Sequence, residues 1–335
     1  MIEKIKCIIC NEPAQITVEN LEGYQKGGYY NIYHCISCDT SFAQPHEINE
    51  KIYDHIYSQA NITPGYNRYA VYAKEIKSRN NPLHYLANEE GAYFAIKEIL
   101  ETGNDKKIRI LEVGSGLGYL TYAIRQNGYD ITGLDISDNA VTKAKNAFGD
   151  YYVCQDVYQF AKNNITKFDI VILTEVIEHV PNPNNFIEIL TSMLRKDGKL
   201  IITTPNKSVF SSKDLWETEL PPVHLTWFSE MSFKTIAQQK KLAFSFFNFS
   251  RFNKKQIDIT RFIFYDRFYR IKKRLPVLDE DGNVITPVIL SDKRGVVETF
   301  NMAVKKMLKP FFILFLTNKK NLNRNNVLCT ILVKQ

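Results

Sequence analysis

Three closely spaced glycines after an apolar strand constrain the fold of this chain more than any other feature. The stretch LEVGSGLGYL, residues 111–120, joins a predicted strand at 108–113 to the start of a predicted helix. A strand, a glycine turn and a helix start form a cradle for a nucleotide-like ligand, because the turn and the helix N-terminus present backbone N–H groups. We therefore expect such a ligand at this turn.

The sequence around this turn alternates between apolar strands and amphipathic helices. With 335 residues, 44% of them hydrophobic, the chain can bury a large core. Strands that alternate with helices form a parallel sheet covered on both faces, so the sequence predicts an α/β fold. The predicted strands are 108–113, 131–135, 151–154, 169–174, 199–204, 242–250 and 327–334.

Four of the six cysteines stand near the start of the chain as two C-x2-C pairs, and the segment between the pairs reads as a hairpin. Four thiolates from two such knuckles bind tetrahedral zinc, and a closed site of this kind is structural. Disulfides are the alternative, which a reducing compartment disfavours. We predict a zinc that stabilises a ribbon too small to fold alone. The ligands would be Cys7, Cys10, Cys35 and Cys38.

Three features of the glycine turn select a ligand without phosphate. The spacing is G-x-G-x-G, because position 119 is Tyr, whereas dinucleotide-binding turns have G-x-G-x-x-G. Glu112, two residues before Gly114, disfavours a pyrophosphate and favours a cation. Asp135 ends the next predicted strand, where a carboxylate can accept both ribose hydroxyls. A positively charged ribose compound without phosphate is S-adenosylmethionine.

From about residue 108 to 250, and again in the last strand, the sequence resembles the class I S-adenosylmethionine-dependent methyltransferases. ILEVGSGLGYL, LDIS, CQDV, ILTEVIEHVPNP and ITTPN are similar to the motifs of that family, in their order. The resemblance implies a Rossmann-like, seven-stranded methyltransferase sheet with an N-terminal zinc ribbon and a helical insertion before the last strand. It also implies cofactor contacts from Glu112, Gly114, Ser115, Gly116, Asp135, Ile136, Asp156, Val157, Thr174 and Glu175.

These features divide the chain into five predicted segments. They are a zinc ribbon at 1–42, a helical connector at 43–105, the cofactor-binding core at 106–250, a basic aromatic insertion at 251–325 and the last core strand at 326–335.

Two histidines are candidates for a general base, which an alcohol acceptor needs because its own pKa lies far above 7. His179 follows the strand at 169–174, and His224 lies in PPVHLTWFSE, a segment that usually covers the acceptor pocket in the family. We predict that one of them takes the acceptor proton, with Glu178 beside it. The alternatives are that His179 holds a helix start and that His224 is bonded within a loop.

The stretch from Glu175 to His179 also resembles an acidic cluster that has been linked to a divalent metal in quinone O-methyltransferases. Two acids and one histidine are few ligands for such an ion. We therefore expect no catalytic metal.

The combination of cysteine knuckles, this core and a PPxHLxxFS-like segment resembles bacterial sugar and cell-surface glycan methyltransferases. We predict O-methylation of a sugar hydroxyl, on a nucleotide sugar or a glycan. Deoxysugar C-methylation is an alternative, although such enzymes usually carry a further C-terminal domain for which 251–325 is too short. RNA base methylation is another, since 251–274 mixes arginines with aromatics. A scaffold that binds the cofactor without turnover is a third, against which the intact motifs argue.

The net charge of +7 belongs to the last third of the chain, where residues 300–335 hold seven basic residues and no acid. The segment 302–320 is an apolar run between lysines, which we interpret as an interior or dimer-facing helix, with a membrane-surface contact as the alternative. No apolar run is long enough to span a membrane, and the first residues do not form a signal peptide. We expect a cytoplasmic protein, with contact to the inner face of the membrane as an alternative location. The sequence does not predict an oligomeric state.

Overall fold

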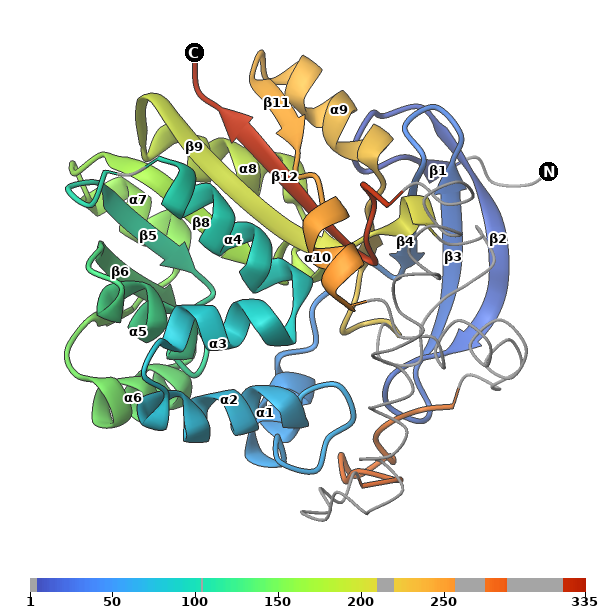
Figure 1. The fold of residues 1–335 in the computed structure, drawn as a ribbon. Helices are drawn as coiled ribbons and strands as arrows, with labels where there is room; N and C mark the ends of the chain where they lie inside the picture. Colours follow the sequence, from blue (N-terminus) through green and yellow to red (C-terminus); the bar gives the residue numbers. More distant parts are fainter. Residues whose placement is uncertain (1–4, 104, 210–219, 257–274, 288–321) are drawn as a thin grey trace.

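A mixed seven-stranded sheet forms the centre of the computed structural model, which describes residues 5–103, 105–209, 220–256, 275–287 and 322–335 (Figure 1). The strand order is β11-β12-β9-β8-β5-β6-β7. The strands are β5 (Arg109–Val113), β6 (Asp130–Asp135), β7 (Tyr152–Cys154), β8 (Phe168–Thr174), β9 (Leu194–Pro205), β11 (Ala243–Phe246) and β12 (Val327–Val333). The predicted α/β fold with a seven-stranded sheet is confirmed.

The sheet differs from the expected parallel arrangement in one strand. β12 runs antiparallel to both of its neighbours, β9 and β11, while β9, β8, β5, β6 and β7 are parallel. β12 therefore lies between two strands that are parallel to each other, and it is the second strand from one edge of the sheet.

Helices cover both faces of this sheet, because successive strand residues point to opposite faces. In β5, Ile110 belongs to the core cluster that contains Leu86, Ile96 and Ala123, whereas Leu111 belongs to the cluster on the other face, which contains Ile187 and Phe233. The helices are α1 (Glu50–Ser58), α2 (Asn67–Glu75), α3 (Pro82–Glu89), α4 (Gly91–Thr102), α5 (Tyr119–Gln126), α6 (Asp138–Phe148), α7 (Val157–Asn163), α8 (Pro183–Ser192), α9 (Glu230–Gln239) and α10 (Ser250–Gln256), with short 3₁₀ turns η1 (Ile76–Ser78), η2 (Ile177–His179) and η3 (Lys207–Val209).

A second sheet contains the cysteine knuckles and confirms the predicted hairpin. Its order is β1-β2-β3-β4-β10, with β1 (Ile5–Lys6), β2 (Pro13–Glu22), β3 (Tyr29–Cys35), β4 (Thr40–Gln44) and β10 (Thr226–Trp227). The last strand of this sheet comes from the segment that follows β9. Three of the cysteines pack in the same core cluster as Leu111 and Phe233, so the knuckles adjoin the large sheet.

A small apolar cluster joins three distant segments beside α1. Tyr24 of the hairpin, Ile56 of α1, Val223 and Leu278 are buried together. This cluster anchors residues 275–287, one of the described parts of the predicted basic insertion, against the first 60 residues.

Residues 257–274 of the basic aromatic stretch 251–274, and the whole segment 302–320, lie outside the described residues. Within the described ranges, no helix has the length and apolar character that crossing a bilayer requires.

Candidate active site

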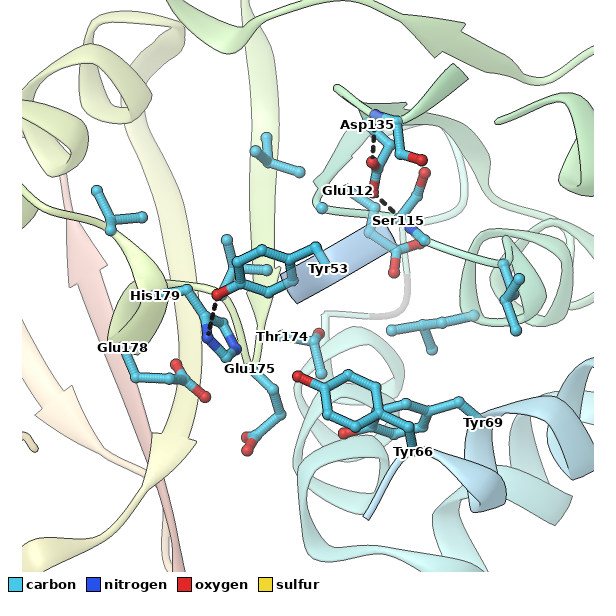
Figure 2. Close-up of a pocket in the computed structure, with 18 of the residues that line it drawn as sticks. Tyr53, Tyr66, Tyr69, Glu112, Ser115, Asp135, Thr174, Glu175, Glu178 and His179 are labelled. Carbon is cyan, nitrogen blue, oxygen red and sulfur yellow. Dashed lines mark hydrogen bonds between the residues drawn. The ribbon is translucent and has the colours of Figure 1, made fainter. Parts of the chain in front are cut away.

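A cavity of about 1710 Å³ opens at the carboxyl ends of β5, β6 and β8 (Figure 2). Pockets for one small ligand usually measure about 300–1,000 Å³, so this cavity has room for a cofactor and an acceptor together. Its lining includes the glycine turn, both candidate histidines and a group of tyrosines from α1 and α2. The end of parallel strands is where open α/β sheets bind ligands.

The glycine turn needs glycine for two physical reasons. Gly114 and Gly116 have φ values of 76° and 49°, in the left-handed region that other residues rarely adopt. A Cβ atom on Gly114 would lie 2.4 Å from a methyl carbon of Val176. The Gly114 and Ser115 N–H groups donate to the Leu134 carbonyl at 2.8 and 3.1 Å, which fixes the turn against β6.

Asp135 at the end of β6 holds the same turn through its carboxylate. Oδ2 accepts from the Gly116 N–H at 2.7 Å, and Oδ1 accepts from the Ser137 N–H at 2.9 Å (Figure 2). Burial raises the pKa of Asp135, while these N–H donors lower it. The carboxylate is therefore fixed at the cavity wall, where a ribose would meet it.

Other predicted cofactor residues also line the cavity. Asp156 caps α7, its Oδ1 accepting from the Tyr158 and Gln159 N–H groups at 2.9 and 3.1 Å. The hydroxyls of Ser115 and Thr174 are buried without a partner among the described residues, which favours a polar ligand beside them. All ten residues predicted to contact the cofactor border the cavity, and their contacts with it stay predictions.

Glu112 lies beneath the turn with 3% of its surface exposed, and its carboxylate accepts a hydrogen bond from the Thr121 hydroxyl. Burial raises the pKa of Glu112 to about 8, so the carboxyl group is mostly protonated at pH 7. A cationic ligand in the cavity would favour the ionised carboxylate and lower this pKa.

Because ionisation of Glu112 favours a cation, the affinity for S-adenosylmethionine should rise with pH between 6 and 8. We expect at most about tenfold per pH unit, since one pKa unit corresponds to about 1.4 kcal/mol. In Glu112→Gln, which keeps an acceptor for Thr121, the affinity should be lower at pH 8 and the slope smaller. Isothermal titration calorimetry from pH 6 to 8 measures both, and an unchanged slope in the variant would contradict the role of Glu112.

His179 and His224 meet at the other end of the cavity, and their ring centroids are 4.7 Å apart. His179 ends η2, and its Nδ1 donates to the Val223 carbonyl, which leaves the lone pair on Nε2. The Tyr53 hydroxyl lies 3.1 Å from the same Nδ1 (Figure 2). His224 is 9% exposed, and its Nδ1 has no partner among the described residues.

Both histidines are neutral at pH 7. Burial lowers the pKa of His179 to about 4. Burial also holds the pKa of His224 well below its ordinary value, and the neighbouring His179 and Arg68 lower it further. Each imidazole can therefore accept a proton, provided that a nearby anion stabilises the imidazolium.

One ligand atom each of Glu178, His179 and His224 lie within 4.8 Å of one another, a set that could alternatively hold a divalent cation.

Glu175 has an unusual backbone and an unusual side chain. It directly follows β8 with φ 53°, and its Oε1 is buried without a partner among the described residues. Burial raises its pKa to about 7, opposed by the nearby Arg68 guanidinium. Strained non-glycine residues with perturbed carboxyl groups are typical of functional sites.

Residues 43–105 form a wall of the cavity, although no site residue was predicted there from sequence. Tyr53, Tyr57, Tyr66 and Tyr69 line it, together with Arg68. Arg68 Nε lies 2.8 Å from Glu90 Oε1, and Arg68 Nη2 donates to the Tyr69 hydroxyl at 2.7 Å. The density of tyrosines in 53–72 was the available signal, but only packing places them at the cavity.

The four cysteines of the knuckles form a compact group of free thiols. The Sγ atoms are 3.5 Å apart between Cys7 and Cys38 and 3.4 Å apart between Cys10 and Cys35, and all four lie within 4.8 Å. Disulfide sulfurs would be about 2 Å apart, whereas a zinc with four thiolates holds its sulfurs about 3.8 Å apart. The donor set and its spacing fit zinc.

Comparison with known proteins finds similarity in the central part of the chain. Residues 85–243 match the family model described as "Methyltransferase domain". The chain is 34% identical over 104 residues to a ubiquinone biosynthesis O-methyltransferase of Coxiella burnetii, a match that covers 30% of this chain and 44% of that protein. A protein of the same name from Glaesserella parasuis is 35% identical over 109 residues, covering 30% and 46%. The chain thus spans less than half the length of these relatives.

Solved structures that match parts of the chain include a SAM-dependent methyltransferase from Archaeoglobus fulgidus, with a TM-score of 0.43, 14% identity and coverage of 72% of this chain and 93% of that one. The plantazolicin methyltransferase BpumL, solved with SAH, has a TM-score of 0.42 and 15% identity and covers 85% and 98%. Residues 85–243 of this chain therefore match a methyltransferase domain.

Proposed function

We propose that this protein transfers a methyl group from S-adenosylmethionine to a hydroxyl group of a sugar, on a nucleotide sugar or a glycan. The observation that carries the proposal is the pair of buried, neutral histidines in a cavity that has room for two ligands. The relatives with 34% and 35% identity are named O-methyltransferases, which favours oxygen as the acceptor atom.

The cofactor brings an already activated methyl group when it is bound, so the chain must orient the acceptor and remove its proton. Asp135 and the glycine turn would hold the ribose and the methionine part. His224 or His179 would accept the hydroxyl proton as the oxygen–carbon bond forms. The carboxylate of Glu178, which belongs to the same cluster, would stabilise the resulting imidazolium.

The charges of the cavity restrict the acceptor. Arg68 is the one lysine or arginine among the described lining residues, and it is paired with Glu90. The acids in the same lining are Glu89, Glu90, Glu112, Asp135, Asp138, Asp156, Glu175 and Glu178. This excess favours an uncharged, hydroxyl-rich group inside the cavity, with any phosphate of the acceptor outside it. It also disfavours the alternative of RNA base methylation.

A phenolic hydroxyl is the second candidate acceptor. The tyrosine wall offers ring faces on which an aromatic acceptor could pack. The relatives named after ubiquinone biosynthesis point in the same direction.

Radiolabelled S-adenosylmethionine, offered with nucleotide sugars, neutral glycosides, catechols or RNA, tests these candidates. We expect label in a sugar fraction, and none of it in that fraction for the His224→Asn variant. Methylation of catechols alone would select the second candidate, and methylation of RNA alone would overturn both.

We also propose that the four cysteines hold a structural zinc, as their spacing and free thiols support. Metal analysis of protein purified without chelator should find about one zinc per chain.

A further inference from the structure

We propose that the cysteine cluster positions His224 for the acceptor, so that metal occupancy at the four cysteines controls acceptor turnover and leaves cofactor binding intact. The inference rests on the proposed function, because that function places His224 and His179 beside the acceptor. Strand β4 would then influence the reaction, although it contributes no residue to the glycine turn.

The first link is the pairing of β4 with β10. β4 begins two residues after Cys38, and it pairs antiparallel with β10 through Phe42 opposite Thr226 and Ser41 opposite Trp227. The Ala43 N–H donates to the Leu225 carbonyl at 2.9 Å, one residue after His224. The segment that carries His224 is therefore laid along a strand that starts at the second knuckle.

A second link ties the knuckle to the far end of the same segment. Ser232 Oγ donates to the Cys38 carbonyl at 3.3 Å and accepts from Thr40 Oγ1 at 2.7 Å. Ser232 also belongs to the capping box of α9, with Ser229 as N-cap. The start of α9, which ends the segment, is thus hydrogen-bonded to the residue that supplies one of the thiols.

On its other side, the segment contacts the turn that carries His179. The Leu225 N–H donates to the Glu178 carbonyl at 2.8 Å, and His179 donates to the Val223 carbonyl. Residues 223–227 are thus clamped between β4 and η2. If the knuckles lost their metal and β4 moved, one side of this clamp would open while η2 remained attached to β8.

The cofactor half of the cavity is built from other elements. Its glycine turn is fixed by the Leu134 carbonyl and by Asp135, both in β6. β6 lies on the opposite side of the large sheet from β9 and β12, with β5 and β8 between them. Disturbance of β4 should therefore reach the acceptor side before the cofactor side.

Trp227 reports on this clamp, because it lies in β10 with 6% of its surface exposed. The chain has two tryptophans, so Trp216→Phe leaves Trp227 as the single emitter. In that background we would remove metal from the full chain with a chelator, and separately substitute Cys10→Ser. Cys154→Ser is the matched control, since Cys154 is an exposed thiol outside the cluster.

Metal loss should shift the Trp227 emission to longer wavelength and reduce kcat/KM for the acceptor by about 100-fold, the scale of a misplaced catalytic group. The dissociation constant of S-adenosylhomocysteine should change by less than about threefold, as for an uncoupled distant site. Added zinc should restore both the Trp227 emission and the acceptor turnover of the chelated protein. The Cys154→Ser control should keep its metal, emission and turnover.

A further variant protects the test against misfolding of Cys10→Ser. Ala43→Pro removes the N–H that donates to Leu225 and leaves every cysteine in place. It should reproduce the emission shift with full metal content. An unshifted emission in this variant, or in metal-free protein, would overturn the proposal.

Two more outcomes would also overturn it: the absence of any bound metal, and loss of S-adenosylhomocysteine binding in parallel with the metal. The second would mean that the metal holds the whole fold. Trp227 emission, metal content and the binding of S-adenosylhomocysteine can be measured without an acceptor. These readouts therefore decide the inference even if no sugar is methylated. Failure of the proposed function is therefore distinguishable from failure of this inference.

Discussion

The His224→Asn variant should lose about 10²–10⁴-fold in kcat/KM for the acceptor, the usual contribution of a general base. His224 is buried at the cavity wall, neutral, and its Nδ1 has no partner among the described residues. Asparagine keeps the polarity of the site but cannot take up a proton. Binding of S-adenosylhomocysteine should be unchanged, because the glycine turn lies at the other end of the cavity.

The experiment includes two further variants: His179→Asn tests the second candidate base, and His84→Asn is the control. His84 is an exposed histidine of α3, so its substitution should change neither turnover nor stability. His179→Asn removes the donor to the Val223 carbonyl and should lower the melting temperature as well as turnover. Full turnover in His224→Asn, combined with a large loss in His179→Asn, would reassign the base to His179.

The pH profile offers an independent check on the histidine base. A base must be unprotonated, so turnover falls when pH drops below its pKa. Because burial lowers the pKa of His179 to about 4 and that of His224 well below its ordinary value, kcat at saturating cofactor should persist at pH 6. A decline centred near 6.5 would indicate an unperturbed histidine.

The Asp135→Ala variant should bind S-adenosylhomocysteine about 10²–10⁴-fold more weakly. Hydrogen bonds to a charged group contribute about 1.5–3 kcal/mol each, and two ribose hydroxyls would lose theirs. The substitution also removes the acceptors for the Gly116 and Ser137 N–H groups, so the turn itself should loosen. Calorimetry with S-adenosylhomocysteine measures the loss.

Asp130→Asn is the matched control, because Asp130 is an exposed acid at the start of the same strand. The affinity of Asp130→Asn for S-adenosylhomocysteine should equal that of the unmodified chain. Undiminished affinity in Asp135→Ala would remove Asp135 from the cofactor site. Tight binding of a nicotinamide dinucleotide by the unmodified chain would overturn the cofactor assignment as a whole.

The features that could be predicted from sequence are those with local periodicity or local turn chemistry. The apolar strand before Gly114 and the positive φ values of the turn leave few alternatives for residues 108–126. Asp135 ends β6 and Asp156 follows the end of β7 by two residues, and parallel strands bring such ends to one edge of the sheet. That geometry alone carries the predicted cofactor residues to the cavity.

The features that could not be predicted depend on contacts between distant segments. The pairing of Trp227 with Ser41 joins residues far apart in the chain and leaves no periodic trace in either one. Tyr53 looks like an ordinary position of an amphipathic helix until its hydroxyl is seen next to His179. The antiparallel direction of β12 likewise follows from its place between β9 and β11, not from its own residues.

The place of β12 has a consequence for the synthesis of the protein. β9 pairs with β12 along its length from Lys199 to Pro205, yet residues 327–333 are made more than a hundred residues after β9. Until then, a nascent chain carries an open hydrogen-bonding edge on an apolar strand, which invites association with other chains. We expect released fragments that stop before residue 327 to remain bound to chaperones, and the released chain that includes 327–333 to dissociate from them.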